Sequence, residues 1–188
     1  EIVIDAGADD IIVMPISIGA VTSRVDNIIE NRKQFVATQR YVGPERRSPG
    51  RNADDELGGF DVPNGVRYKA TGDESAKVDI AKIESANSVV REHRLRRTTL
   101  QFGNTADAIE DVIKNNPGDS VPVNKLSEMS DLVDYIARHT EKYSRPEICN
   151  LVDSLQEVMD EAAVDSRPEA DLFALLGVHG DALLALLR

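Results

Sequence analysis

Apolar residues recur at helical spacing through the C-terminal part of the chain, from about residue 74 onward. Positions i, i+3, i+4 and i+7 share one face of a helix, so each such stretch predicts an amphipathic helix that buries one stripe. Packing several stripes together gives a helical bundle. We expect Gly177 and Gly180 to bend or interrupt the last helix. The predicted helices span residues 74–95, 105–115, 122–142, 144–163 and 168–188.

The first of these helices carries a second pattern, in which six residues alternate four and three positions apart. Such a heptad-like seam is typical of paired helices, and a single Asn within it can fix the register of a two-stranded coiled coil. Because the seam is short, two interpretations stay open: self-association through it, or packing of this helix on the C-terminal bundle. The basic cluster 91–97 is expected to end the helix, where cations favour the helix dipole. The seam residues are Ala76, Ile80, Ile83, Asn87, Val90 and Arg94.

A different pattern marks the N-terminal region. The continuous apolar run 11–13 predicts a short strand buried on both faces of a parallel sheet. Pro15 lacks a backbone donor and should end that strand. Ser17 then fits the N-cap of a helix that runs to about Asn31.

Between these regions, residues 33–73 contain clustered Gly and Pro and no apolar periodicity, which predicts a linker. The expected organisation is therefore an N-terminal segment over 1–32, a flexible linker over 33–73 and a helical output or interaction module over 74–188. The predicted fold class is mainly α.

Composition narrows the class of protein. Of the 188 residues 41% are hydrophobic but only 4% aromatic, which favours helices packed through Ala, Leu and Val. The single cysteine, Cys149, excludes an internal disulfide and a Cys-based zinc site. The apolar runs are shorter than a membrane span, and no signal peptide is evident, so we expect a cytoplasmic protein with no membrane partner.

Charge is unevenly distributed along the chain. Residues 1–32, 33–102 and 103–188 carry net charges of −4, +3 and −10, within the total of −11. Such a negative chain is a poor ligand for nucleic acid, and no helix-turn-helix pattern with a basic recognition helix is present. We therefore predict no nucleic-acid partner.

The segment from Asp5 to Ile29 contains the string Asp-Ala-Gly-Ala-Asp-Asp-Ile-Ile-Val-Met-Pro-Ile-Ser, followed by the predicted helix. It resembles the last strand and last helix of a bacterial response-regulator receiver domain, where the usual sequence pattern is Ala-Gly-Ala-Asp-Asp-aromatic-x-x-Lys-Pro. The resemblance implies that residues 1–32 are the remnant of a truncated α/β receiver with a flavodoxin-like fold. It also implies that Glu1–Ile4 ends a helix, although propensity alone favours a strand there. Most of the receiver would then precede Glu1.

A second string, from Phe35 to Arg47, has the core Tyr-x-Gly-Pro-Glu-Arg-Arg. It resembles a segment that follows receiver domains in alphaproteobacterial regulators. Either Phe35 and Tyr41 dock on the receiver while Arg46 and Arg47 pair with an acidic surface, or the segment is an extended, solvated tether.

Two residues depart from the receiver pattern. Met14 replaces the Lys that pairs with the phosphorylated aspartate, and Ile11 replaces the Tyr or Phe that reports the switch; Pro15 is retained. A thioether cannot neutralise an aspartyl phosphate, so phosphorylation is expected to be absent or altered. The family's Mg²⁺ ligands lie at the end of the first strand, so Mg²⁺ is expected only in an intact receiver. We interpret Asp9 and Asp10 as a solvated turn.

One further constellation, His139-Thr-Glu-Lys142, is similar to the His-x-x-Lys of histidine phosphotransfer domains, because positions i and i+3 share a helix face. Tyr143 stands where that family has Gly, and an ordinary solvent-facing His is the alternative. His93 and His179 show no metal-ligand spacing, and no nucleophile elbow or phosphate loop is present. The chain is therefore predicted to lack enzymatic activity.

Together these features predict part of a response regulator that acts in two-component phosphorelay signalling through protein–protein contacts of its helical module. A sensor histidine kinase or another signalling protein is the expected partner, and a homodimer is possible through the seam. The alternatives are a histidine phosphotransfer domain and a structural helical oligomer without signalling chemistry.

Overall fold

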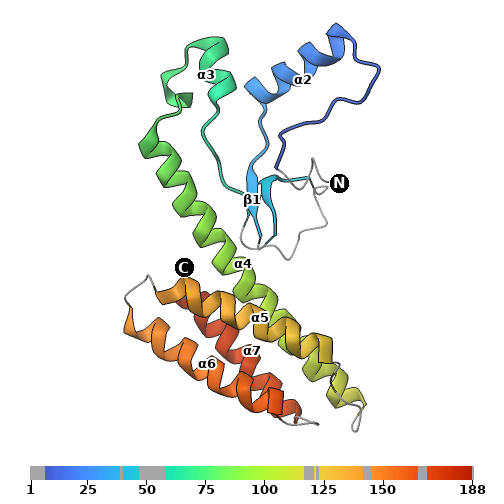
Figure 1. Ribbon diagram of the computed structural model, residues 1–188, viewed down its shortest axis with the longest axis vertical. Helices are drawn as coiled ribbons and strands as arrows, with labels where there is room; N and C mark the ends of the chain where they lie inside the picture. Colours follow the sequence, from blue (N-terminus) through green and yellow to red (C-terminus); the bar gives the residue numbers. More distant parts are fainter. Residues whose placement is uncertain are drawn as a thin grey trace. The chain divides into compact units, whose positions relative to one another are not determined.

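The computed structural model describes residues 7–38, 40–46, 58–116, 121, 123–141, 145–164 and 169–187. This part of the chain is mainly helical, with a small two-stranded sheet and a C-terminal helical bundle, so the predicted fold class is confirmed (Figure 1). The chain divides into two compact units, Glu1–Arg94 and Leu95–Arg188. We describe each unit by itself.

The first unit contains short elements and the start of one long helix. In chain order they are α2 (Ile18–Glu30), β1 (Phe35–Ala37), β2 (Val42–Pro44), α3 (Gly65–Thr71), the 3₁₀ turn η1 (Glu74–Ala76) and the N-terminal part of α4 (Ile80–Asn115).

Helix α2 begins where the sequence predicts. The Oγ atom of Ser17 accepts a hydrogen bond from the backbone N–H of Ala20 at 3.1 Å, which satisfies one of the free donors of the first turn. The helix ends at Asn31, whose N–H donates to the carbonyl of Asn27. The predicted helix from Ser17 to about Asn31 is therefore confirmed.

The strand predicted over 11–13 does not form. These residues have no regular secondary structure, and Val13 is 79% exposed. A strand needs a neighbour with which to exchange backbone hydrogen bonds, and the sheet of the described residues consists of β1 and β2 alone. The apolar run 11–13 has a high propensity for a strand, but without a neighbouring strand to pair with it does not form one.

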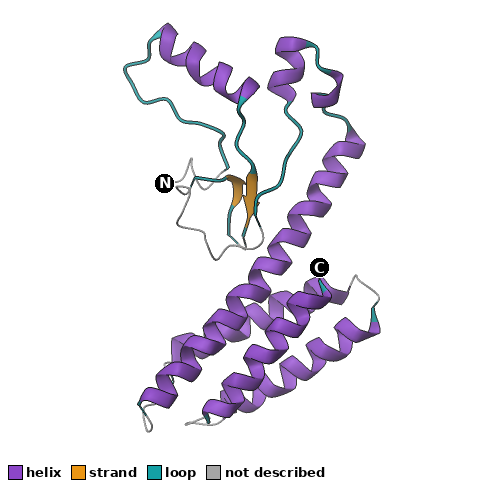
Figure 2. Ribbon diagram, turned by 180° about the vertical axis from the view of Figure 1, so that it is seen from behind, coloured by secondary structure: helices purple, strands orange, loops and turns teal. Residues whose placement is uncertain are grey.

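The segment predicted as a linker contains a hairpin. Strands β1 and β2 pair antiparallel, with Val36 opposite Gly43, and a backbone bridge joins Phe35 to Phe60 (Figure 2). Val36, Ala37 and Phe60 are buried. Gly43-Pro44 in β2 is typical of a turn, so the residue pattern does not predict a strand here.

Helix α4 is continuous, whereas the sequence predicted two helices separated by a break. It starts after Asp79, whose Oδ1 accepts from the N–H of Lys82 at 2.8 Å, and it continues through the basic cluster. The region predicted as a break carries a buried stripe that includes Leu95, Thr99 and Phe102. The hydroxyl of Thr99 donates to the carbonyl of Leu95 at 3.0 Å, so a buried Thr is satisfied inside the helix.

The second unit is a bundle of the C-terminal part of α4 with α5 (Val123–Thr140), α6 (Pro146–Val164) and α7 (Ala170–Leu186). Helix α7 runs through Gly177 and Gly180 without interruption, so of the two expected effects, a bend or an interruption, the interruption is wrong. No helix of the described ranges combines the length and the apolar character needed to cross a membrane. The largest fully buried apolar side chains are Leu95, Phe102, Met129, Leu132, Ile136, Ile148, Leu155, Phe173, Leu176 and Leu183.

Candidate functional site

The Gly7–Asp10 turn is fixed by two arginines of the first unit. Arg32 forms a bidentate ion pair with Asp9, with Nε and Nη2 at 2.6 and 3.0 Å from the two carboxylate oxygens. The third nitrogen of Arg32, Nη1, donates to the carbonyl of Pro63 at 2.8 Å, and the guanidinium lies 4.7 Å from the centre of the Phe35 ring. Bidentate, charge-assisted pairs of this kind fix geometry as well as adding stability.

Asp10 is paired separately. Its Oδ2 lies 2.8 Å from a guanidinium nitrogen of Arg24, and its Oδ1 accepts from the N–H of Ile11 at 2.7 Å. The pKa of Asp10 is lowered mainly by the backbone hydrogen bond from Ile11; burial opposes this shift, and Arg24 adds to it. Asp9 and Asp10 lie in a turn and stay partly exposed to solvent, and both carboxylates are also engaged by arginines distant in sequence.

The turn lies directly against the hairpin. A Cβ added to Gly43 would come within 2.8 Å of the Cα of Gly7, and one added to Gly7 would come within 2.3 Å of the carbonyl oxygen of Val42. Gly7 also has a φ of +77°, which other residues rarely adopt. Only glycines allow this approach of two backbones.

The Tyr-x-Gly-Pro-Glu-Arg-Arg string contains the residues of the hairpin that contact the turn. The hydroxyl of Tyr41 donates to the carbonyl of Pro44 at 2.9 Å, and Arg46 donates to the carbonyl of Ala8. Within the described part of this string, Arg46 reaches the Gly7–Asp10 turn through a backbone carbonyl, whereas the hydroxyl of Tyr41 bonds inside the string itself. Arg47 lies outside the described residues.

The same hairpin contacts the N-terminal part of α4. Nε of Arg94 donates to the carbonyl of Thr38 at 2.9 Å, just beyond the end of β1. The ring of His93 lies 4.7 Å from that of Phe60, whose backbone pairs with Phe35. The turn, the hairpin and this stretch of α4 are thus one connected set of contacts, which we call the turn–hairpin site.

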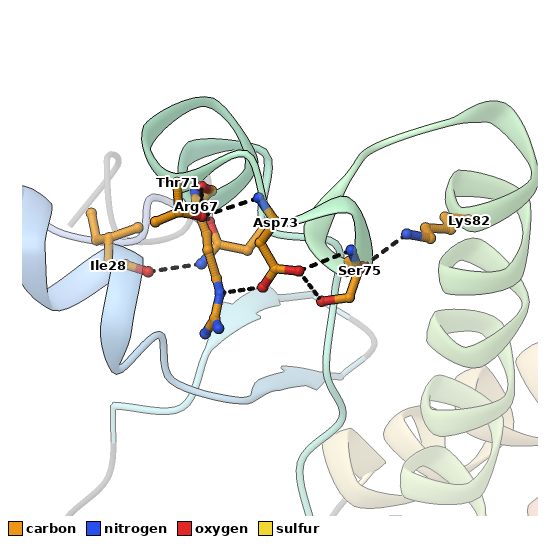
Figure 3. Close-up of polar contacts among 7 residues, drawn as sticks. Ile28, Arg67, Thr71, Asp73, Ser75 and Lys82 are labelled. Atoms are coloured by element: carbon orange, nitrogen blue, oxygen red, sulfur yellow. Dashed lines mark hydrogen bonds and ion pairs between the residues drawn. The ribbon is translucent and has the colours of Figure 1, made fainter.

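An open groove of about 600 Å³ lies between α2, α3 and α4 in the same unit. Its walls are held by internal polar contacts: Asn64 donates to the carbonyl of Ile28, and Arg67 pairs with Asp73 at 2.8 Å (Figure 3). Lys82 donates to two backbone carbonyls, one of which is that of Ser75. Arg67 and Lys82 are therefore both engaged by partners within this unit.

The residues that depart from the receiver pattern lie on one segment ahead of α2. Met14 is 75% exposed, Pro15 is also exposed and Ile11 is half-buried. Asp9 and Asp10 are each paired with an arginine, Arg32 and Arg24 respectively. Within the described ranges, no group of three or more His, Cys, Asp or Glu residues could hold a metal ion.

His139 lies half-buried near the end of α5. Its ring stacks on that of Tyr135 with centroids 3.9 Å apart, and its Nδ1 lies 2.7 Å from the carbonyl of Tyr135. Because a carbonyl only accepts, Nδ1 is the donor of this hydrogen bond, and in the neutral imidazole the lone pair is then on Nε2. Lys142, the second residue of the phosphotransfer string, lies outside the described residues.

A Ser–His pair joins α6 and α7, and sequence reasoning missed it. Nδ1 of His179 donates to the carbonyl of Leu175 at 2.8 Å, so Nε2 accepts from the hydroxyl of Ser154 at 2.9 Å. The two residues are 25 positions apart, and no local spacing signals the pair. It serves as a polar link between helices.

Comparison with known proteins adds no relative. No protein-family model matches the chain, and neither a curated protein nor a solved structure is significantly similar to it.

Proposed function

We propose that this chain is part of a response regulator of a two-component phosphorelay, and that it signals through protein–protein contacts of its helical module. The observation that carries the proposal is the Gly-Ala-Asp-Asp turn followed by an apolar segment, Pro15 and a helix capped by Ser17. The Tyr-x-Gly-Pro-Glu-Arg-Arg string, which independently resembles a receiver-associated segment, supports it because its described part binds that same turn.

The turn–hairpin site gives the proposed signal a physical route. In the receiver pattern, the residue that reports the switch stands at the position of Ile11, directly after this turn. Here that turn contacts β2 through Gly7 and Arg46, and the hairpin contacts α4 through Arg94 and His93. Packed elements with specific hydrogen bonds can pass a displacement from one site to another. A change at the turn would therefore reach α4, which continues into the bundle.

Met14 and Ile11 bear on how the proposed receiver would be phosphorylated. A receiver with Met14 before its conserved Pro lacks the cation that normally stabilises the aspartyl phosphate. The proposed regulator accordingly takes a phosphoryl group from its sensor kinase with altered kinetics, or responds to a partner protein without phosphorylation.

A histidine phosphotransfer role for His139 is the second candidate. It is supported by the tautomer, because the Nε2 atom left unprotonated is a competent nucleophile. Stacking on Tyr135 and partial burial weigh against it, since a docking receiver needs access to that atom. A purely structural helical oligomer is the third candidate.

The coding region that precedes Glu1 tests the main proposal. The expected result is a first strand that ends in acidic residues, followed by a central aspartate, in frame with Glu1. The whole reading frame is then incubated with acetyl phosphate and Mg²⁺, with the Met14→Lys variant as the matched comparison. An unrelated upstream sequence contradicts the proposal.

A further inference from the structure

The N-terminal part of α4 has two distinct faces. One face is used inside the first unit: Lys82 binds the carbonyl of Ser75, Ala86 and Val89 line the groove, and His93 contacts Phe60. The other face carries the part of the heptad-like seam formed by Ile80, Ile83, Asn87 and Val90, which we call the α4 seam.

The α4 seam is left largely open to solvent. Ile80 is 76% exposed and Ile83 is 46% exposed, while Asn87 is exposed and Val90 is half-buried. The seam ends at Arg94, which is the next heptad position and is bound to the carbonyl of Thr38. Two isoleucines almost one turn apart on an exposed helix face represent apolar area that association would remove from water.

We propose that the α4 seam pairs with the same seam of a second copy of this chain, parallel and in register. The spacing 80, 83, 87, 90 places Ile80 and Asn87 at one type of core position (a) and Ile83 and Val90 at the other (d). In a parallel, in-register pair each residue meets its own copy across the two-fold axis. Apolar residues then meet apolar residues in three of the four layers.

Asn87 is the reason to choose a second copy over another helix. Its amide has both donors and an acceptor, so two Asn87 side chains satisfy each other across the axis. Against an ordinary apolar helix face the same amide would be buried without a partner, at a cost of about 1–3 kcal/mol. Isoleucine at both core positions by itself favours three or four strands, and the core Asn is the residue that specifies two.

This pairing does not depend on the resemblance to receivers, so it can fail or succeed separately from the proposed function. It also has a distinct salt dependence. Each copy carries a net charge of −11, and the repulsion between copies is screened by salt. The dimer therefore tightens as ionic strength rises.

Sedimentation velocity of the full chain across protein concentration tests the proposal. The wild type is expected to show a concentration-dependent dimer, and Ile83→Asp to weaken it at least about tenfold, which corresponds to ~1.4 kcal/mol. Circular dichroism should show unchanged helix content. The matched control is Ile18→Asp, at a residue of α2 that is 87% exposed, and it should leave the dimer intact. A wild type that stays monomeric up to about 1 mM, or a dimer lost in Ile18→Asp but kept in Ile83→Asp, overturns the proposal.

Disulfide trapping tests the register in a Cys149→Ser background, which removes the natural thiol. Val90→Cys, which leaves Asn87 in place, should form a cross-linked dimer, because in-register core positions bring the two Cα atoms within about 7 Å. Ser88→Cys, two residues earlier on the same helix, points away from the core and should not cross-link. Equal cross-linking at both positions, or cross-linking at Ser88 alone, contradicts a parallel in-register pair.

Discussion

At residue 43 the hairpin backbone passes so close to Gly7 and Tyr41 that no side chain fits. A Cβ there would lie 2.4 Å from the Tyr41 hydroxyl as well as 2.8 Å from the Cα of Gly7. We expect Gly43→Ala to lower the free energy of unfolding of the first unit by about 1–3 kcal/mol, as for other overpacked sites. Thermal unfolding followed by circular dichroism would measure the change.

Gly19→Ala is the matched control for that substitution. Gly19 lies in α2, and a Cβ at this position meets nothing within 4 Å. Alanine should stabilise the helix by up to about 1 kcal/mol because it restricts the unfolded chain. Equal effects at residues 19 and 43 would mean that the Gly7–Gly43 approach is not a specific contact.

Asp107 gives a prediction of pH dependence. Its pKa is raised, first by burial and then by the nearby charges of Asp181, Glu110 and Asp111. The folded state therefore binds this proton more tightly than the unfolded chain, whose carboxyl has a pKa near 3.8. Asp107 therefore contributes most favourably to the free energy of unfolding at a pH below the unfolded-state pKa. This contribution is lost as the pH rises through the raised pKa of the folded state. Because the side chain is largely exposed, Asp107→Asn should stabilise the bundle at pH 7 by only about a few tenths of a kcal/mol. The gain should vanish near pH 3; an equal gain at both pH values contradicts this assignment.

His139 allows the phosphotransfer alternative to be tested directly. That alternative predicts an acid-labile phosphohistidine after incubation with a phosphorylated receiver, and loss of the label in His139→Ala. His179→Ala is the control, since His179 also donates through Nδ1 to a carbonyl of its own helix but bonds Ser154 through Nε2. Label that persists in His139→Ala removes this candidate.

Some residues of the site could be predicted from the sequence and others could not. The Ser17 cap follows from local chemistry, because a hydroxyl ahead of a helical pattern has one obvious donor to bind. The pairing of Asp9 with Arg32 joins residues 23 positions apart across a chain bend, so only tertiary structure decides it. For the same reason the Ser154–His179 pair was not foreseen.

At the scale of elements, α4 and α7 approach each other through glycines. A Cβ on Gly180 would lie 3.3 Å from the Cα of Gly103, whereas one on Gly103 would meet nothing within 4 Å. We expect Gly180→Val to separate the two helices and destabilise the bundle by about 1–3 kcal/mol. Gly103→Ala should be neutral or stabilising. Thermal unfolding of both variants is the measurement, and a neutral Gly180→Val contradicts close packing at this point.

The sequence predicted the elements with a strong apolar period and missed those formed by context. Helices α2, α5 and α6 lie close to their predicted bounds because their stripes are continuous. The break predicted within α4 is wrong. Thr98, Thr99 and Gly103 are polar or flexible residue types that weaken the apolar pattern, although all three are buried within the helix. The hairpin was missed because strands of three residues give too short an alternation to detect.

For the whole molecule, the account requires that a change at the turn reach α4 through the hairpin. The contacts that carry this claim are the Gly7–Gly43 approach and the hydrogen bond from Arg94 to the carbonyl of Thr38. If they act together, loosening the first should loosen the second, since the hairpin is too small to absorb the change alone.

Amide hydrogen exchange of the Gly43→Ala variant, compared with wild type and Gly19→Ala, tests this claim most directly. The account predicts faster exchange both in the hairpin and in residues 89–94 of α4, with no such change in Gly19→Ala. Faster exchange confined to residues 7–46, with α4 unaffected, would contradict the proposed route from the turn to the helical module.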